Sequence, residues 1–429
     1  MKAKNCLIFG GSGQIGRNLI RKLTKNNFRV TVVTRNIHQK SYIIKTQANV
    51  GYIDIVEANI FDEKKIRELF KKSDICVNLI GILFEKKRGN TFKNIHTIFP
   101  SLLAKLSKEY NLKHFIHLSA LGINEAKDSA YANSKVEGEN NILKNFPLAT
   151  ILRPSVVYSV DDNFTTNFMT LLNRLPFFPL YYSGATKFSP IHCSDLTDTI
   201  YHVISNNIYS KIIECVGPEV FTFKEIIIKL LNLIGKKKIL LPMPLTVAKT
   251  TARIFEIMPK PLLTRDQLKL LKYDNIVSGK YKTNSDIGVP SVRFFDEEVK
   301  KYCYMWREGG QFSTEKYLSK TAENENDVFA SLSATFCGEG LVFKVGDNEQ
   351  ISEPVQVLFV SNGGNQVMYT PRLVWQLGKL SELKVIAKFV GVEGGYFING
   401  IQDWLLAEGA GVSFTQVQAD SFDSWHLSK

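Results

Sequence analysis

The sequence lacks the long apolar run that a membrane-spanning helix needs and the paired cysteines typical of many metal and redox sites. Nowhere do about 18 apolar residues follow one another without interruption. The six cysteines are scattered and include no C-x-x-C pair, which favours reduced thiols with structural roles. No group of histidines, cysteines and carboxylates has metal-ligand spacing, so we predict no metal site. The cysteines are Cys6, Cys76, Cys193, Cys215, Cys303 and Cys337.

The sequence also leaves no room for a leader before the first strand pattern, which begins at Asn5. We therefore expect a cytoplasmic protein, or one whose presequence has been removed. The net charge of +13 is unevenly distributed, since residues 321–429 contain only 6 Lys/Arg against 13 Asp/Glu. Recognition-helix, zinc-finger and aromatic-platform patterns are missing, so we expect no nucleic acid partner.

Short apolar strands alternate with amphipathic helical stretches over residues 1–160. This alternation predicts an α/β fold with a Rossmann-type, doubly wound parallel sheet that forms an NAD(P)-binding domain. Right-handed crossovers would bring the carboxyl ends of the strands to one edge, where ligands bind. The expected strands are Asn5–Phe9, Arg29–Thr34, Ile53–Ala58, Ile75–Ile80, Phe115–Ser119 and Ala149–Arg153.

Changes in composition and in the period of the apolar residues divide the rest of the chain into three parts. Residues 161–313 are expected to form a smaller substrate-side subdomain of the same unit, and the polar residues 314–327 a linker. In residues 328–429, segments such as "GLVFKV" and "GVSFTQVQ" have a period of two, which predicts an all-β segment, either a sandwich or a stacked β-coil. The helices expected in the subdomain are Phe223–Ile234, Pro244–Ile257 and Thr264–Tyr273.

The segment "CLIFGGSGQIGR" places Gly10, Gly13 and Gly16 between the first strand and the first helix. Because glycine has no Cβ, the chain can turn sharply, approach a pyrophosphate and pack the helix on the sheet. The N-terminus of the helix then points N–H groups at the phosphates. This spacing in a strand–turn–helix context predicts dinucleotide binding rather than a purely structural turn.

The ends of the second and third strands bear on the choice of cofactor. Arg35 stands where an NAD-binding enzyme commonly has an acidic residue, and together with Arg17 it would attract a 2′-phosphate. This favours NADP(H), while NAD(H) stays open because Arg35 is otherwise simply solvated. Asn59 and Ile60 are placed to meet the adenine ring, and Asp62 to cap the next helix.

Ser119, Tyr131 and Lys135 form a candidate catalytic set. Ser119 ends the fifth strand, and in "YANSK" a helix would place Tyr131 and Lys135 on one face. The Lys135 ammonium would lower the pKa of Tyr131, which would act as the acid/base. Lys135 would also hold the nicotinamide ribose, and Ser119 would steady the substrate oxygen. The alternative is a surface helix that contains the same two residues by chance.

The glycine loop, "FIHLSALG", "YANSK" and "ILRPSVVY" together resemble the extended short-chain dehydrogenase/reductase superfamily, with its NAD-dependent epimerases and dehydratases. Further segments are similar to the atypical branch that contains the nucleotide-binding accessory subunit of respiratory complex I. The resemblance covers residues 1–313. These segments are "VNLIGIL", "FKNIHT", "FSPIHCSDL", "VGPEVFTFKEI" and "RDQLKLLKYDNIV".

This resemblance implies a protein that binds NADPH and serves the assembly and stability of complex I without a known turnover. It implies complex I subunits as partners and a place at the inner face of a respiratory membrane, in the mitochondrial matrix if the chain is organellar. There its basic surface would contact anionic lipid. An active NADP-dependent oxidoreductase or nucleotide-sugar epimerase/dehydratase is the alternative.

The resemblance also implies roles for single residues. Tyr131 and Lys135 would contact the nicotinamide ribose, and whether they also move a proton stays open. His96 occupies the position where many relatives have an asparagine, and His192 belongs to a packing segment under the substrate pocket. The expected cofactor contacts are Gly10, Ser12, Gly13, Gln14, Ile15, Gly16, Arg17, Arg35, Asn59, Ile60, Ile80, Gly81, Ser119, Tyr131, Lys135 and Pro154.

Residues 328–429 resemble part of the SufB/SufD core of iron–sulfur assembly scaffolds, in "EGLVFKV", "EPVQVLFVS" and "AEGAGV". This resemblance implies a partial right-handed parallel β-helix and SufB/SufC-like partners. We assign none of that family's assembly residues to this segment, and we interpret Cys337 and His426 as structural. A real fusion and a join of two unrelated reading frames both account for the change in composition.

Overall fold

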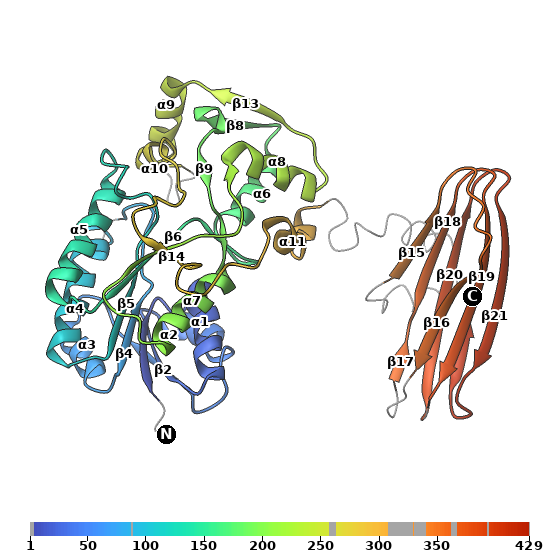
Figure 1. Cartoon of the computed structure of the whole chain (residues 1–429), viewed down its shortest axis with the longest axis horizontal. Helices are drawn as coiled ribbons and strands as arrows, with labels where there is room; N and C mark the ends of the chain where they lie inside the picture. Colours follow the sequence, from blue (N-terminus) through green and yellow to red (C-terminus); the bar gives the residue numbers. More distant parts are fainter. Residues whose placement is uncertain are drawn as a thin grey trace. The chain divides into compact units, whose positions relative to one another are not determined.

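In the computed structural model, the chain divides into two units, residues 1–308 and residues 309–429 (Figure 1). The structure describes residues 4–86, 89–256, 263–307, 329, 340–361, 367–392 and 394–428. The linker expected at 314–327 and Cys337 lie outside the described residues. None of the helices within these ranges is long and apolar enough to span a membrane.

Unit 1 is built on an eight-stranded sheet in the order β14-β11-β6-β5-β4-β1-β2-β3, and every pairing in it is parallel. The six strands expected from the sequence are present, with ends within two residues of the prediction. Two short strands from later in the chain, β11 and β14, extend the sheet beyond residues 1–160. The strands are β1 (Asn5–Phe9), β2 (Arg29–Thr34), β3 (Ile53–Glu57), β4 (Ile75–Asn78), β5 (His114–Leu118), β6 (Thr150–Pro154), β11 (Ile212–Cys215) and β14 (Lys282–Thr283).

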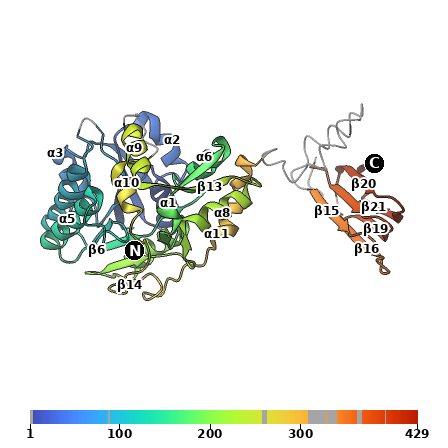
Figure 2. The same ribbon diagram turned by 90° about the horizontal axis from the view of Figure 1, so that it is seen from above.

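Helices cover both faces of this sheet, as the doubly wound prediction requires (Figure 2). One face packs against α1, α2 and α7 through a buried cluster that includes Leu19 and Ile200. The other packs against α3, α4 and α5 through a cluster that includes Leu103 and Ile142. The strand order reverses beside β1, where a doubly wound sheet binds its ligand. The helices are α1 (Gln14–Lys25), α2 (Ile37–Lys45), α3 (Glu63–Phe70), α4 (Phe99–Glu109), α5 (Ala130–Asn145) and α7 (Cys193–Ser205).

The other residues of unit 1 surround a second, aromatic core that includes Tyr158, Phe178, Phe223 and Phe295. The three helices expected in this region correspond to α8, α9 and α10. The helices are α6 (Thr165–Arg174), α8 (Phe223–Leu233), α9 (Leu245–Phe255), α10 (Arg265–Leu270) and α11 (Phe295–Lys300). The strands are β7 (Val157–Tyr158), β8 (Phe177–Tyr181), β9 (Lys187–Phe188), β10 (Ile191–His192), β12 (Phe221–Thr222) and β13 (Ile239–Met243).

Unit 2 consists of parallel strands stacked coil on coil. β18 pairs with β15 and β20, and β19 pairs with β16 and β21, always in parallel. Val357 pairs with Ala387, which shows that one coil takes 30 residues. The structure therefore confirms the stacked β-coil and excludes the sandwich. The strands are β15 (Gly340–Val345), β16 (Val355–Ser361), β17 (Val367–Tyr369), β18 (Arg372–Leu377), β19 (Glu382–Gly391), β20 (Tyr396–Leu406), β21 (Gly411–Ala419) and β22 (Trp425–Ser428).

Aromatic rings stack between neighbouring coils inside unit 2. The ring centroids of Phe343 and Trp375 lie 4.3 Å apart, and those of Trp375 and Trp404 lie 5.3 Å apart, both pairs nearly parallel. The strand register places the three side chains at equivalent positions of β15, β18 and β20. Trp375 is completely buried, so this ladder lies at the centre of the core.

We expect Trp375→Ala to lower the free energy of unfolding of unit 2 by about 3–5 kcal/mol, because it leaves a cavity between two stacked rings. Trp425→Ala is the control, since Trp425 on β22 is 79% exposed, and its effect should stay within about 0.5 kcal/mol. Calorimetric unfolding of the full chain measures both. Equal destabilisation by the two substitutions would contradict the buried ladder.

Candidate functional site

The glycine loop lies at the carboxyl end of β1, where the strand order reverses. Gly10 has a φ of +87°, and a Cβ there would lie 3.1 Å from the carbonyl carbon of Leu79, which follows β4. A Cβ on Gly16 would lie 2.5 Å from the carbonyl oxygen of Gly10. Both positions therefore require glycine, and the first turn of α1 lies directly against the end of β1.

The N-terminus of α1 fits a pyrophosphate. Gly13 is its N-cap residue, its first turn contains no acidic residue, and no side chain in the described part of the chain caps it. Of the expected contacts in this turn, Gln14 accepts a hydrogen bond from the Ser159 hydroxyl at 2.9 Å, while Ile15 packs on the core. The positive end of the helix dipole thus meets a glycine-lined turn, which suits the phosphates of a dinucleotide.

The two arginines expected to favour a 2′-phosphate already have polar partners. Arg17 forms an ion pair with Asp161 and donates to the carbonyl oxygen of Ser12 at 3.3 Å. Arg35 is exposed just after β2 and donates to the side-chain oxygen of Asn90 at 3.3 Å. To bind a phosphate, Arg35 would give up only a hydrogen bond to a neutral amide, whereas Arg17 would have to give up an ion pair with a carboxylate.

The residues expected to meet the adenine ring follow β3. Asn59 is exposed and its side-chain oxygen accepts from the N–H of Phe61 at 3.2 Å, while Ile60 is buried. Asp62 accepts from the N–H of Lys65 at 3.1 Å and so caps α3, which confirms that expectation. Asn59 is the more accessible of the two expected adenine contacts.

The structure brings Lys135 to the end of β5, next to Ser119. The Lys135 ammonium is buried and donates to the carbonyl oxygen of Leu118 at 3.1 Å. Its Nζ lies 6.0 Å from the centroid of the Tyr131 ring. The Ser119 hydroxyl is buried without a hydrogen-bond partner among the described residues, which leaves it able to bond a ligand. Pro154, another expected contact, is buried at the end of β6 and accepts from the N–H of Leu121 at 2.9 Å.

Burial rather than charge controls the pKa values in this group. Burial raises the pKa of Tyr131 to about 12 and lowers the pKa of Lys135 to about 8. The expectation that Lys135 lowers the pKa of Tyr131 is therefore wrong for this structure, because burial of the phenol raises that pKa. At neutral pH Tyr131 keeps its proton and can donate it in a hydrogen bond.

His96 holds the loop after β4 over this group, a role that the sequence did not reveal. It lies in a short π-helix, Lys93–Ile98, and its Nε2 accepts from the N–H of Ile82 at 3.1 Å. Nδ1 therefore carries the proton and donates to the Ser134 hydroxyl at 2.9 Å. Burial, followed by the charge of Lys135, lowers the pKa of His96 to about 2, so it stays neutral.

The loop that His96 holds contains two expected cofactor contacts. The N–H of Ile80 donates to the side-chain oxygen of Asn78 at 3.1 Å, at the end of β4. A Cβ on Gly81 would lie 3.5 Å from Nζ of Lys135. Gly81 therefore lies next to the Lys135 ammonium.

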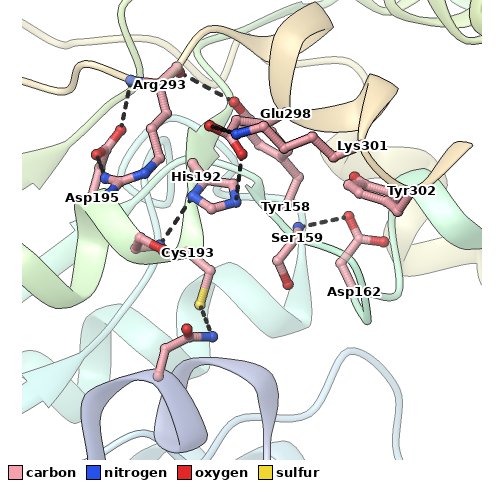
Figure 3. Close-up of polar contacts among 12 residues, drawn as sticks. Tyr158, Ser159, Asp162, His192, Cys193, Asp195, Arg293, Glu298, Lys301 and Tyr302 are labelled. Atoms are coloured by element: carbon pink, nitrogen blue, oxygen red, sulfur yellow. Dashed lines mark hydrogen bonds and ion pairs between the residues drawn. The ribbon is translucent and has the colours of Figure 1, made fainter. Parts of the chain in front are cut away.

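A second group of polar side chains, most of them half-buried, joins β10, α7 and α11 (Figure 3). Nε2 of His192 lies 3.9 Å from the carboxylate of Glu298, and its Nδ1 accepts from the N–H of Ser194 at 3.3 Å. Arg293 pairs with Asp195 beside them. Burial lowers the pKa of His192, consistent with a packing residue. Within the described residues, no group of three or more His, Cys, Asp or Glu could hold a metal ion.

Comparison with known proteins shows what the larger unit is similar to. Residues 6–212 match the model of the NAD dependent epimerase/dehydratase family. The chain is 26% identical over 315 residues to NADH dehydrogenase [ubiquinone] 1 alpha subcomplex subunit 9 of Arabidopsis thaliana, covering 71% of this chain and 78% of the relative. It is 30% identical over 219 residues to the protein of that name from Dictyostelium discoideum, covering 51% and 60%.

Solved structures agree on the fold. A Bordetella bronchiseptica enzyme, WbmG, solved in complex with NAD, aligns with a TM-score of 0.54 at 14% identity, covering 71% of this chain and 94% of the enzyme. A dTDP-glucose 4,6-dehydratase from Streptomyces venezuelae, with NAD and TYD bound, aligns with a TM-score of 0.54 at 16% identity, covering 73% and 100%. At these identities the likeness establishes the Rossmann-type fold alone.

These comparisons confirm, over 71% of the chain, the resemblance to the complex I accessory subunit, and they confirm the reductase-like fold. They give no support to the SufB/SufD resemblance of residues 328–429. What the structure shows there is a parallel β-coil, in which His426 lies 2.6 Å from the carboxylate of Asp420.

The pKa of Lys135 predicts how stability changes with pH. Because burial lowers this pKa from 10.5 to about 8, the folded chain releases the proton first, and its stability rises as pH increases above 8. Relative to Lys135→Met, the unsubstituted protein should gain up to about 3 kcal/mol between pH 8 and 10. Urea unfolding at a series of pH values measures this difference.

Lys144→Met, at an exposed position of the same helix, is the matched control and should show no such gain. The window ends at pH 10, because the raised pKa of Tyr131 has the opposite effect above it. A difference between protein and Lys135→Met that stays constant from pH 8 to 10 would refute the buried ammonium.

Proposed function

We propose that this chain is a nucleotide-binding accessory subunit of respiratory complex I that holds NADP(H) in residues 1–313. The observation that carries the proposal is the alignment of 71% of the chain with a complex I subunit, combined with a glycine loop built for a dinucleotide. The chain would act at the inner face of a respiratory membrane, or in the mitochondrial matrix if organellar. Its basic surface, with +13 overall, suits anionic lipid.

NADP(H) is the proposed cofactor because of the charge at the end of β2. The position after Thr34 is the exposed Arg35, whose polar partner among the described residues is the neutral Asn90. A guanidinium there attracts a 2′-phosphate and offers no acceptor to a 2′-hydroxyl of NAD. A bound NADPH would supply a hydride at its nicotinamide, while Tyr131 and Lys135 would hold the adjoining ribose.

The site supports holding the cofactor better than turning it over. Tyr131 has a pKa of about 12, so it gives up its proton poorly to a substrate oxygen at neutral pH. An active oxidoreductase is the second candidate. The Ser119 hydroxyl supports it, since it has no hydrogen-bond partner among the described residues and could bind a substrate oxygen. The two candidates differ in what they require of the Tyr131 hydroxyl.

We expect Arg35→Ala to weaken NADPH binding by about 10–100-fold and to leave NADH binding within about twofold, because only the 2′-phosphate loses a charge-assisted partner. Arg29→Ala, at the exposed start of the same strand, is the matched control. Native mass spectrometry of the purified chain and titration of nicotinamide fluorescence measure both. Equal weakening of NADPH and NADH would count against the 2′-phosphate contact.

Tyr131→Phe separates the two candidate functions. The accessory role predicts that the variant, purified by affinity from its source, still co-migrates with complex I subunits and still contains dinucleotide, since the ring keeps its packing. The oxidoreductase predicts that dinucleotide is kept but turnover with carbonyl substrates falls at least about 100-fold. If complex I subunits do not co-purify with the unsubstituted chain, the accessory role is wrong.

For residues 328–429 we propose a protein-binding role, with SufB/SufC-like iron–sulfur assembly proteins as the candidate partners. The parallel coil supports this, because its end strands β15 and β21 each pair on one side only among the described residues. The same affinity purification tests it. Recovery of complex I subunits without any SufB/SufC-like protein would reject these partners.

A further inference from the structure

The first turn of α5, which contains Tyr131, is capped by a carboxylate from a distant helix. Asp266 of α10 accepts the N–H of Ala130 at 2.8 Å, the N–H of Tyr131 at 2.9 Å and the hydroxyl of Ser129 at 2.8 Å. Ser129 itself accepts from the N–H of Ala132 at 3.2 Å. The donors that open this helix therefore depend on one side chain more than 130 residues away.

α10 is locally built to present this carboxylate. A capping box between Thr264 and Gln267 starts the helix, and Asp266 occupies its first turn. At the other end, Lys269 donates to the carbonyl oxygen of Asp128 at 2.8 Å, which ties α10 to the residue before the Ser129 cap. Two separate contacts thus hold α10 against the start of α5.

The segment that contains Asp266 also shares a small hydrophobic cluster with Tyr131. Leu270 and Tyr273 pack against the buried residues Ile123 and Ala132, and so does Tyr131. Residues 264–273 therefore both cap the helix that contains Tyr131 and pack against the same cluster as its ring.

The far end of the same segment is anchored across the carboxyl ends of β5 and β6. The amide of Asn275 donates to the carbonyl oxygen of Leu121 at 2.7 Å and accepts from the hydroxyl of Ser155 at 2.6 Å. Its backbone N–H donates to the carbonyl oxygen of Lys187 at 2.7 Å. Residues 264–275 therefore form a strap that is tied to the start of α5 at one end and to the loops after β5 and β6 at the other.

We infer that Asp266 is a positioning residue for the nicotinamide half of the dinucleotide site. The inference rests on the proposed function, because it assumes that Tyr131 and Lys135 hold the nicotinamide ribose. Without the carboxylate, two N–H groups and one hydroxyl lose their acceptor and the first turn of α5 frays. Tyr131 lies in that turn, whereas the glycine loop and Arg35 lie on other elements. The nicotinamide half of the site therefore loosens and the adenine half does not.

The test compares a whole cofactor with its adenine half. In the full chain, Asp266→Ala should weaken NADPH binding about tenfold, the size expected for loss of a helix cap. Binding of 2′,5′-ADP, which has no nicotinamide ribose, should stay within about twofold. Asp266→Asn keeps one acceptor oxygen and should fall between the two. Isothermal titration calorimetry measures both ligands.

Glu256→Gln is the matched control, because Glu256 pairs with Arg265 of α10 and, among the described residues, forms no hydrogen bond or ion pair with α5. It should leave both affinities unchanged. Equal NADPH binding by Asp266→Ala and the unsubstituted chain overturns the inference, and so does an equal loss for both ligands, which indicates general destabilisation. If the unsubstituted chain binds neither ligand, both the proposed function and this inference are wrong.

Discussion

The rest of unit 1 depends on one constraint, which is the close contact between the backbones of Gly10 and Gly16 at the end of β1. A Cβ at Gly16 would overlap the carbonyl oxygen of Gly10, so only glycine lets α1 begin this close to the sheet. Gly10 in turn touches Leu79 in the loop after β4, and His96 fixes that loop through Ile82. The close packing at the end of β1 therefore also affects where the loop after β4 lies, and this loop contains Gly81, next to Lys135.

The position of Lys135 also depends on a buried ion pair one helical turn further along α5. Glu139 and Arg153 are both buried, and Nε of Arg153 lies 3.0 Å from the Glu139 carboxylate. Such a pair recovers its desolvation cost only when its geometry is well satisfied, which fixes how α5 lies on β6. The charge of Glu139 also raises the pKa of Lys135, opposing the burial that lowers it. The lysine therefore remains largely protonated at neutral pH, as a ribose contact requires.

The sequence allowed prediction of features that depend on neighbouring residues, and not of those that depend on distant ones. The strands β1 to β6 are apolar runs followed by helix patterns, so their ends were predicted to within two residues. β14 has only two residues, and β11 is not part of the regular alternation of residues 1–160; both pair because the chain returns to the sheet edge. The acceptor role of His96 and the cap from Asp266 join segments 14 and 136 residues apart, which spacing cannot show. The raised pKa of Tyr131 follows from burial, which is likewise a tertiary property.

The way the nicotinamide end is built bears on what a bound cofactor could do. A reductase that turns over has to admit and release a second substrate beside Tyr131. Residues 264–275 make separate hydrogen bonds to the start of α5 and to the loops after β5 and β6. Moving this strap away means breaking the bonds at both of its ends. Under the proposed accessory role, a bound cofactor would then leave slowly, because dissociation slows when the surrounding groups are held in place.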